Sequence, residues 1–220
     1  RVNQEFFTPT SIVKEMIKFS GFDKLDKFTI GHILEPSAGW GNIVKELLNV
    51  MEKKKYNMKI DCVEYNEENR EELEKIADIV PSVVSLMAES NFLRYITSTR
   101  YEYVFMNPPF HLQKKLHKGV LNDDAYDFHF VMRAYAFLAL GGVLIAVIGR
   151  KYEKSAYAKK FFKKVGAELK KKNKVNWTGA EVKKGGEVKA LDITYVYIKR
   201  QLVDKREEDE ILKITSQLYK

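Results

Sequence analysis

The sequence contains a single cysteine, Cys62, which excludes a disulfide framework and a cysteine-based zinc site within this chain. The four histidines, at positions 32, 111, 117 and 129, show no metal-ligand spacing, so no metal site is predicted. The longest apolar run, FLALGGVLIAVIG, is too short for a membrane span and is broken by two glycines. No signal peptide is recognisable. These absences favour a reducing, cytoplasmic location and no membrane partner.

What the chain does contain is enough apolar sequence for a sizeable core and an excess of positive charge. Hydrophobic residues make up 45% of the 220 residues, the net charge is +8 and the pI is about 9.3. A basic protein of this kind suits a polyanionic partner such as a nucleic acid. A lysine-rich solvated surface explains the same charge equally well.

Strand and helix patterns alternate along the chain, without internal repeats or low-complexity linkers. Near-continuous apolar strands that alternate with amphipathic helices predict an α/β fold with a parallel sheet covered on both faces. Strands are expected at residues 28–34, 58–65, 81–88, 101–106 and 141–149, with a final strand pair at 174–182 and 189–199. Helices are expected at residues 8–19, 41–53, 66–78, 123–140, 154–172 and 204–219.

Several details of these helices are also predicted. Thr8 is a candidate cap of the first helix, with Pro9 in its first turn, and Asn66 is a cap for the third. The apolar residues between Phe130 and Leu138 are spaced as one helical stripe. The lysines of KKFFKK and LKKKNK are expected on the solvent face of the helix at 154–172.

The segment YVFMNPPF, residues 103–110, runs from apolar residues directly into an asparagine and two prolines. Two adjacent prolines cannot continue a helix or a strand ladder, so the strand is expected to stop at Met106. Ligands of open parallel sheets bind outside the carboxyl ends of the strands, which puts NPPF on the ligand edge. A rigid turn with no further role is the alternative explanation.

Two other segments lie at comparable positions. LEPSAGWGN, residues 34–42, follows the first expected strand, and Gly39 and Gly41 permit a tight turn with close backbone approach to a ligand. Without a third glycine, this pattern also describes a generic strand-to-helix turn. Glu64 ends the second expected strand and can accept hydrogen bonds from both hydroxyls of a ribose. Its alternative role is a helix-start acid, and Asp61 is a competing candidate.

Together these segments resemble the N6-adenine DNA methyltransferases that use S-adenosylmethionine, in the subgroup whose cofactor motif precedes the catalytic motif. EFFTP resembles the N-terminal cofactor motif, EPSAGWGN the glycine-rich motif and NPPF the catalytic tetrapeptide. ALGGVLIAVI and GAEVKKGGEVKALDITYVYIK resemble the later strands, so the resemblance covers nearly the whole chain. It implies a Rossmann-like methyltransferase fold, with a mostly parallel seven-stranded sheet, helices on both faces and a terminal antiparallel strand pair.

The resemblance also implies a domain organisation and a set of partners. Residues 1–200 would form the catalytic domain and residues 201–220 a C-terminal helical appendage, with no separate target-recognition domain. We therefore expect weak sequence preference on DNA, with specificity supplied by a further subunit or an additional domain.

The resemblance assigns the S-adenosylmethionine site to Phe7, Thr8, Pro9, Glu35, Pro36, Ser37, Gly39, Gly41, Glu64, Tyr65, Asn91, Phe92 and Asn107. One position departs from the family, which commonly has an acidic residue where this chain has Asn91. The Asn91 carbonyl oxygen can still accept a hydrogen bond from the cofactor's adenine amine, without charge assistance. Phe92 would pack on the adenine ring, or it is an ordinary core aromatic.

The resemblance assigns catalysis to Asn107, Pro108, Pro109 and Phe110. The Asn107 side-chain oxygen and the Pro108 carbonyl would accept the two N–H groups of the adenine amine and stabilise the positive charge that develops on nitrogen. Phe110 would stack on a base that has been flipped out of the helix. No general base is required, so neither His111 nor Asp127 is assigned a catalytic role.

The loop that follows, HLQKKLHKG, contains Lys114, Lys115 and Lys118 as candidate phosphate contacts, unless it is simply a solvated loop. The leading interpretation is therefore a DNA adenine-N6 methyltransferase. Three alternatives stay open: methylation of adenine N6 in RNA, methylation of a protein glutamine at N5, and a degenerate nucleic-acid-binding subunit of a methyltransferase complex.

Overall fold

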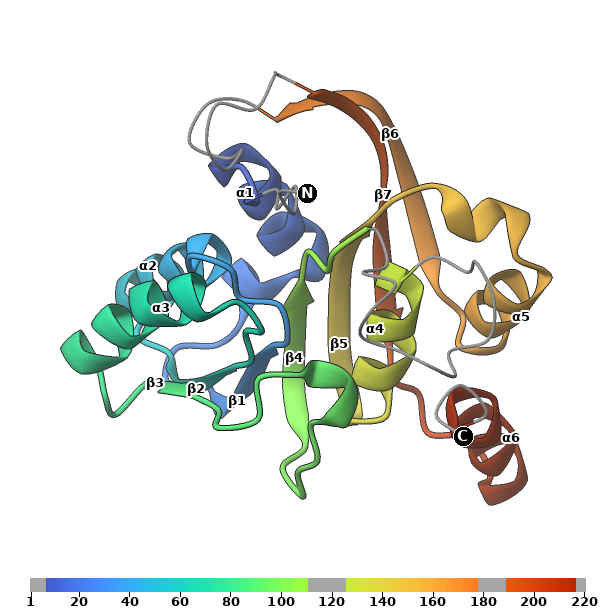
Figure 1. The fold of residues 1–220 in the computed structure, drawn as a ribbon. Helices are drawn as coiled ribbons and strands as arrows, with labels where there is room; N and C mark the ends of the chain where they lie inside the picture. Colours follow the sequence, from blue (N-terminus) through green and yellow to red (C-terminus); the bar gives the residue numbers. More distant parts are fainter. Residues whose placement is uncertain (1–6, 111–125, 178–188, 217–220) are drawn as a thin grey trace.

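The computed structural model describes residues 7–110, 126–177 and 189–216 (Figure 1). Its seven strands are β1 (Ile30–Glu35), β2 (Asn57–Cys62), β3 (Val84–Leu86), β4 (Tyr101–Met106), β5 (Leu138–Ile148), β6 (Glu168–Trp177) and β7 (Lys189–Lys199). The helices are α1 (Thr10–Ser20), α2 (Asn42–Lys54), α3 (Glu67–Ile79), α4 (Tyr126–Tyr135), α5 (Ala156–Lys164) and α6 (Lys205–Ser216). Short 3₁₀ helices are η1 (Phe22–Lys24), η2 (Phe92–Arg94) and η3 (Lys151–Lys154).

The strands form one sheet in the order β3-β2-β1-β4-β5-β7-β6. Strands β1 to β5 pair in parallel, whereas β7 pairs antiparallel with both β5 and β6. This arrangement confirms the predicted fold class, a Rossmann-like sheet that is mostly parallel and ends in an antiparallel pair. The pattern was readable because strands buried on both faces must be apolar along most of their length.

Helices cover both faces of the sheet, and each face has its own apolar core (Figure 1). On one face, α1, α2 and α3 contribute residues such as Met16, Leu47 and Leu73. On the other face, α4 and α5 contribute Val131 and Phe161, and Ile211 of α6 joins the same cluster. The sheet is therefore buried in its centre, and its polar loops are left at the strand ends.

The strand order reverses between β1 and β4, which pair in parallel from Ile33 with Tyr103 and Leu34 with Val104. From β1 the chain adds β2 and β3 on one side of the sheet, whereas β4 and β5 lie on the other side of β1. Open α/β sheets bind their ligands at such a switch point, outside the carboxyl ends of the strands. The segments after Glu35 and Met106 lie at this point.

Two predicted helices are shorter in the structure than the sequence indicated. Helix α4 ends at Tyr135, and Leu138 instead begins β5, where it pairs with Tyr101. Helix α5 ends at Lys164, and the lysines at 170–172 lie in the edge strand β6. In both cases pairing with a neighbouring strand, formed between residues distant in sequence, overrides the local helical pattern.

The cap predictions had different outcomes. Asn66 caps α3 as predicted, because its side chain accepts a hydrogen bond from the Asn69 backbone N–H. The prediction for Thr8 was wrong, because α1 begins at Thr10 with Pro9 as its cap residue and no side-chain cap bond. The Thr8 side chain is used elsewhere.

Candidate active site

The glycine turn connects the end of β1 to α2. Gly39 and Gly41 have φ angles of 55° and 84°, in the left-handed region that favours glycine. A Cβ at Gly41 would lie 2.6 Å from the Cδ1 atom of Ile76, so that side chain would have to shift to admit another residue. The left-handed φ angles are therefore what favour glycine at both positions of this turn.

The segment Phe7–Pro9 lies against this turn. The Phe7 ring stacks on Trp40 with centroids 4.1 Å apart, and a Cβ on Gly39 would lie 3.3 Å from Phe7. The Asn42 side chain donates to the Thr8 carbonyl oxygen at 3.1 Å. Phe7, Thr8 and Pro9 are all buried, so these contacts hold the segment firmly on the glycine turn. Glu5 and Phe6, the start of the predicted motif, lie outside the described residues.

Asn107 follows β4 directly, and its amide nitrogen donates to the Thr8 hydroxyl oxygen at 3.0 Å. This bond uses the nitrogen end of the amide and so fixes the direction of the oxygen. Pro108 is buried and Pro109 exposed, which anchors the tetrapeptide on one side only. Phe110 is half-buried, close to Gly149 at the end of β5. The structure therefore brings the predicted N-terminal, glycine-rich and catalytic motifs to one edge.

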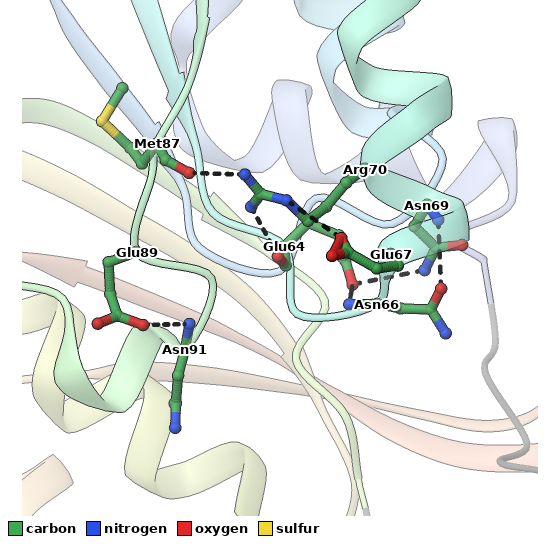
Figure 2. Close-up of polar contacts among 8 residues, drawn as sticks. All are labelled: Glu64, Asn66, Glu67, Asn69, Arg70, Met87, Glu89 and Asn91. Atoms are coloured by element: carbon green, nitrogen blue, oxygen red, sulfur yellow. Dashed lines mark hydrogen bonds and ion pairs between the residues drawn. The ribbon is translucent and has the colours of Figure 1, made fainter.

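Glu64 is buried between the glycine turn and the start of α3. One carboxylate oxygen accepts from the Gly39 N–H at 2.6 Å, and the other accepts from the Asn66 N–H at 2.8 Å. Figure 2 shows Arg70 beside it, donating to the carbonyl oxygens of Glu64 at 3.0 Å and Met87 at 3.1 Å. Arg70 therefore joins the loops after β2 and β3. Tyr65, the neighbouring candidate, is half exposed.

Asn91 and Phe92 lie at the next loop along the edge. The Asn91 side-chain oxygen accepts from the Leu93 N–H at 3.0 Å and so caps η2. The Asn91 N–H donates to the Glu89 carboxylate at 2.8 Å, which brings an acid close to the position where the family commonly has one (Figure 2). Phe92 is buried and packs at 5.2 Å between ring centroids from Phe130, as a core aromatic does.

Glu35, at the end of β1, is 1% exposed and accepts from the Ser37 N–H at 2.9 Å. Burial, with a smaller contribution from the nearby charge of Glu64, raises the pKa of Glu35 to about 8. Pro36 is buried beside it. An acid that binds its proton near neutral pH thus lies directly beneath the glycine turn.

Asp127, in the first turn of α4, is a second buried acid at this edge. Its carboxylate accepts from the Gly149 N–H at 2.7 Å and from the Phe128 N–H at 2.8 Å. Burial raises the pKa of Asp127 to about 7, although these bonds and the charge of Lys151 lower it in part. The carboxylate joins α4 to the end of β5 beside Phe110.

Sequence reasoning missed three of these contributors: Trp40, Arg70 and Glu89. Trp40 lies inside the glycine-rich motif, and an aromatic residue at such a turn indicates packing against another segment. The positions of Arg70 and Glu89 depend on how neighbouring loops meet, which the sequence does not indicate. The candidate phosphate contacts Lys114, Lys115 and Lys118 lie outside the described residues.

Within the described part of the chain, no group of three or more histidine, cysteine, aspartate or glutamate side chains could hold a metal ion. None of the described helices combines the length and apolar character that a membrane crossing needs.

The sequence matches the family model described as the methyltransferase small domain over residues 22–176, which is well over half of the chain. The chain belongs to this family. It is thus a methyltransferase, and S-adenosylmethionine is the cofactor that goes with its fold. Comparison with curated protein sequences finds no significant match.

Solved structures show the same fold at low sequence identity. A provisionally assigned RNA methyltransferase of Pyrococcus horikoshii is 15% identical, with a TM-score of 0.65 over 90% of this chain and 87% of its own. The type I restriction-modification methyltransferase subunit of Streptococcus thermophilus is 14% identical, with a TM-score of 0.63 over 100% of this chain and 55% of its own. A Thermus thermophilus 16S rRNA N2 G1207 methyltransferase, in complex with AdoMet and guanosine, is 17% identical to the present chain. Its TM-score is 0.54 over 88% of the present chain and 43% of the Thermus chain.

Proposed function

We propose that this methyltransferase transfers the methyl group of S-adenosylmethionine to the N6 amine of adenine in DNA. The observation that carries the proposal is the position of Asn107–Phe110, directly after β4 at the switch point of the sheet and next to the glycine turn. An Asn-Pro-Pro-Phe segment at this position suits an exocyclic amine on a planar ring. Other exocyclic amines and the amide nitrogen of glutamine present the same two N–H groups, so the substrate-class assay below separates them from adenine N6.

The donor set beside the glycine turn fits the cofactor. Glu64 offers carboxylate oxygens for ribose hydroxyls, the glycines permit close backbone approach, and Thr8 presents a hydroxyl between the turn and Asn107. When bound, S-adenosylmethionine supplies an electrophilic methyl group on a sulfonium. Phe7, Pro9, Pro36, Ser37, Tyr65, Asn91 and Phe92 remain assigned to the walls of this site.

Asn107 is the side chain that would activate the amine. The adenine N6 lone pair is delocalised into the ring, so the nitrogen is a weak nucleophile in the ground state. The Asn107 oxygen and the Pro108 carbonyl would each accept one N–H of the amine, which favours a pyramidal nitrogen and stabilises its developing charge. Phe110 would hold the flipped base by stacking, at about 1–3 kcal/mol per base.

The Thr8 hydroxyl is a positioning contact for this step. We expect Thr8→Val to lower kcat about fivefold to tenfold with a smaller change in KM, because one hydrogen bond of about 1 kcal/mol no longer holds the Asn107 amide. Thr8→Ser should restore most of kcat. Thr10→Val, two residues away at an exposed position, is the matched control. Equal kcat in Thr8→Val and the parent would remove Thr8 from this role.

Glu64 gives a test of the cofactor site. Glu64→Ala removes the acceptors assigned to the ribose and also releases the Gly39 N–H. We expect S-adenosylmethionine affinity to fall by about 1.5–3 kcal/mol, the cost of losing charged hydrogen bonds. Isothermal calorimetry measures the change directly, and exposed Glu74→Gln is the control. Unchanged affinity in Glu64→Ala would rule out the ribose assignment.

The substrate class is tested by tritiated-methyl transfer to DNA, RNA and protein in parallel. The Streptococcus thermophilus subunit, which aligns with all of this chain, belongs to a restriction-modification system and supports DNA. RNA is the second candidate, because two of the structures named above are RNA methyltransferases by description. Label at N6 of adenine in DNA is the expected result. Label only in protein, or at another base position, would contradict the proposal.

A further inference from the structure

The turn that follows β5 places a group of cations at the same edge of the sheet as Asn107. Its sequence, RKYEK at residues 150–154, contains three basic residues and one acid. The turn borders Phe110, because a Cβ on Gly149, the residue before it, would lie 3.9 Å from the Phe110 ring. Phe110 is the side chain assigned above to the target base.

Lys151 and Lys154 are spaced to share one face of this turn. They are the first and last residues of η3, and in a 3₁₀ helix the side chains at i and i+3 lie nearly above one another. Both residues are exposed. The turn is anchored from below, because the hydroxyl of buried Tyr152 hydrogen bonds to Thr194 of β7 at 3.0 Å. Ser155 then caps α5 by accepting from the Ala158 N–H at 3.1 Å.

The acid of the turn is engaged elsewhere. Glu153 accepts from Arg150 at 2.8 Å and forms an ion pair with Lys171 of β6. The hydrogen bonds from Arg150 and Lys171 lower the pKa of Glu153 to about 2, so its carboxylate stays charged beside these two cations. Lys151 and Lys154 give the exposed face of η3 its positive charge on an anchored backbone, and Lys151 also acts on the buried Asp127 carboxylate, whose pKa it lowers.

We propose that this face of η3, formed by Lys151 and Lys154, binds the phosphodiester backbone of the nucleic acid beside the target base. The inference rests on the proposed function and identifies a surface that would hold the strand while the base stacks on Phe110. Lysines act as point charges toward phosphates and position a strand without reading its sequence. An anchored turn loses little conformational entropy when it binds, which favours such a contact.

The test compares two double variants with the same change in charge. K151Q/K154Q removes the proposed contacts. K53Q/K54Q is the matched control, because these exposed lysines lie in the last turn of α2, which starts at the ligand edge and ends at the opposite edge. Binding of a short fluorescein-labelled DNA duplex is followed by anisotropy between about 50 and 200 mM salt. Calorimetry with S-adenosylmethionine checks that both variants remain folded.

Each phosphate contact contributes about 0.9 to the slope of log affinity against log salt. We expect K151Q/K154Q to make that slope shallower by about 1.8 and to weaken binding at low salt about tenfold or more. The control should keep the slope and affinity of the parent. An unchanged slope in K151Q/K154Q, or an equal loss in the control, would overturn the proposal. The proposal would also be overturned if a polyglutamate peptide bound the parent as tightly as DNA does and lost as much affinity as DNA in K151Q/K154Q.

The binding measurement needs no turnover, so the two proposals fail separately. Adenine methylation by a K151Q/K154Q variant with an unchanged salt slope would refute the η3 surface alone. If the parent methylates no adenine but K151Q/K154Q still has a shallower salt slope, the proposed function is refuted and the η3 surface is retained as a nucleic-acid contact.

Discussion

Replacing Asn107 with alanine is expected to lower kcat by about 100- to 1,000-fold, the usual cost of losing one group aimed at developing charge. The variant removes the oxygen proposed to accept an N–H of the adenine amine. S-adenosylmethionine affinity should change little, because the substituted oxygen would face the substrate. Single-turnover methyl transfer and calorimetry measure the two quantities separately.

The Asn107→Ala result needs controls, because the same side chain also donates to Thr8 at 3.0 Å. Asn107→Asp keeps an acceptor oxygen and should retain more activity than the alanine variant, and the Thr8 hydroxyl can donate to the new carboxylate. Asn57→Ala changes an exposed asparagine at the start of β2, at the opposite edge of the sheet, and should leave kcat unaffected. Turnover of Asn107→Ala within a few-fold of the parent would remove Asn107 from its assigned role.

The second large effect concerns the pH dependence of stability. The pKa of Glu35 is raised from its ordinary 4.5 to about 8 by burial, so the folded chain holds this proton more tightly than the unfolded chain. Between these two values, folding takes up a proton, and the free energy of unfolding falls as pH rises by up to about 1.4 kcal/mol per pH unit. The loss levels off above the folded pKa.

Glu35→Gln removes this titration while it keeps a carbonyl oxygen for the Ser37 N–H. We expect the variant to match the parent within about 1 kcal/mol at pH 5 and to exceed it by about 2–4 kcal/mol at pH 8. Urea unfolding at several pH values measures the difference. Asp127 contributes a slope of the same sign to both proteins, because its pKa is also raised, to about 7. Parallel profiles of parent and variant would mean that Glu35 is already ionised in the folded protein.

The sequence by itself determined the fold class and the three segments of the candidate site. Alternation of apolar strands with amphipathic helices specifies a parallel sheet, because strands covered on both faces must be apolar along their length. The prolines of NPPF and the glycines of EPSAGWGN identify strand ends through backbone restrictions that are local. The Asn66 cap was readable for the same reason.

Only the tertiary structure decided how far helices extend and which side chains meet. The residues 168–172 look helical in isolation but pair with β7, and the gain from that ladder comes from residues about 25 positions away in the chain. Thr8 looked like a cap, yet it bonds Asn107 across 99 positions of sequence. The stack of Phe7 on Trp40 and the raised pKa of Glu35 likewise depend on packing and desolvation. Contacts and burial of this kind exist only after the chain has folded, and so no local pattern encodes them.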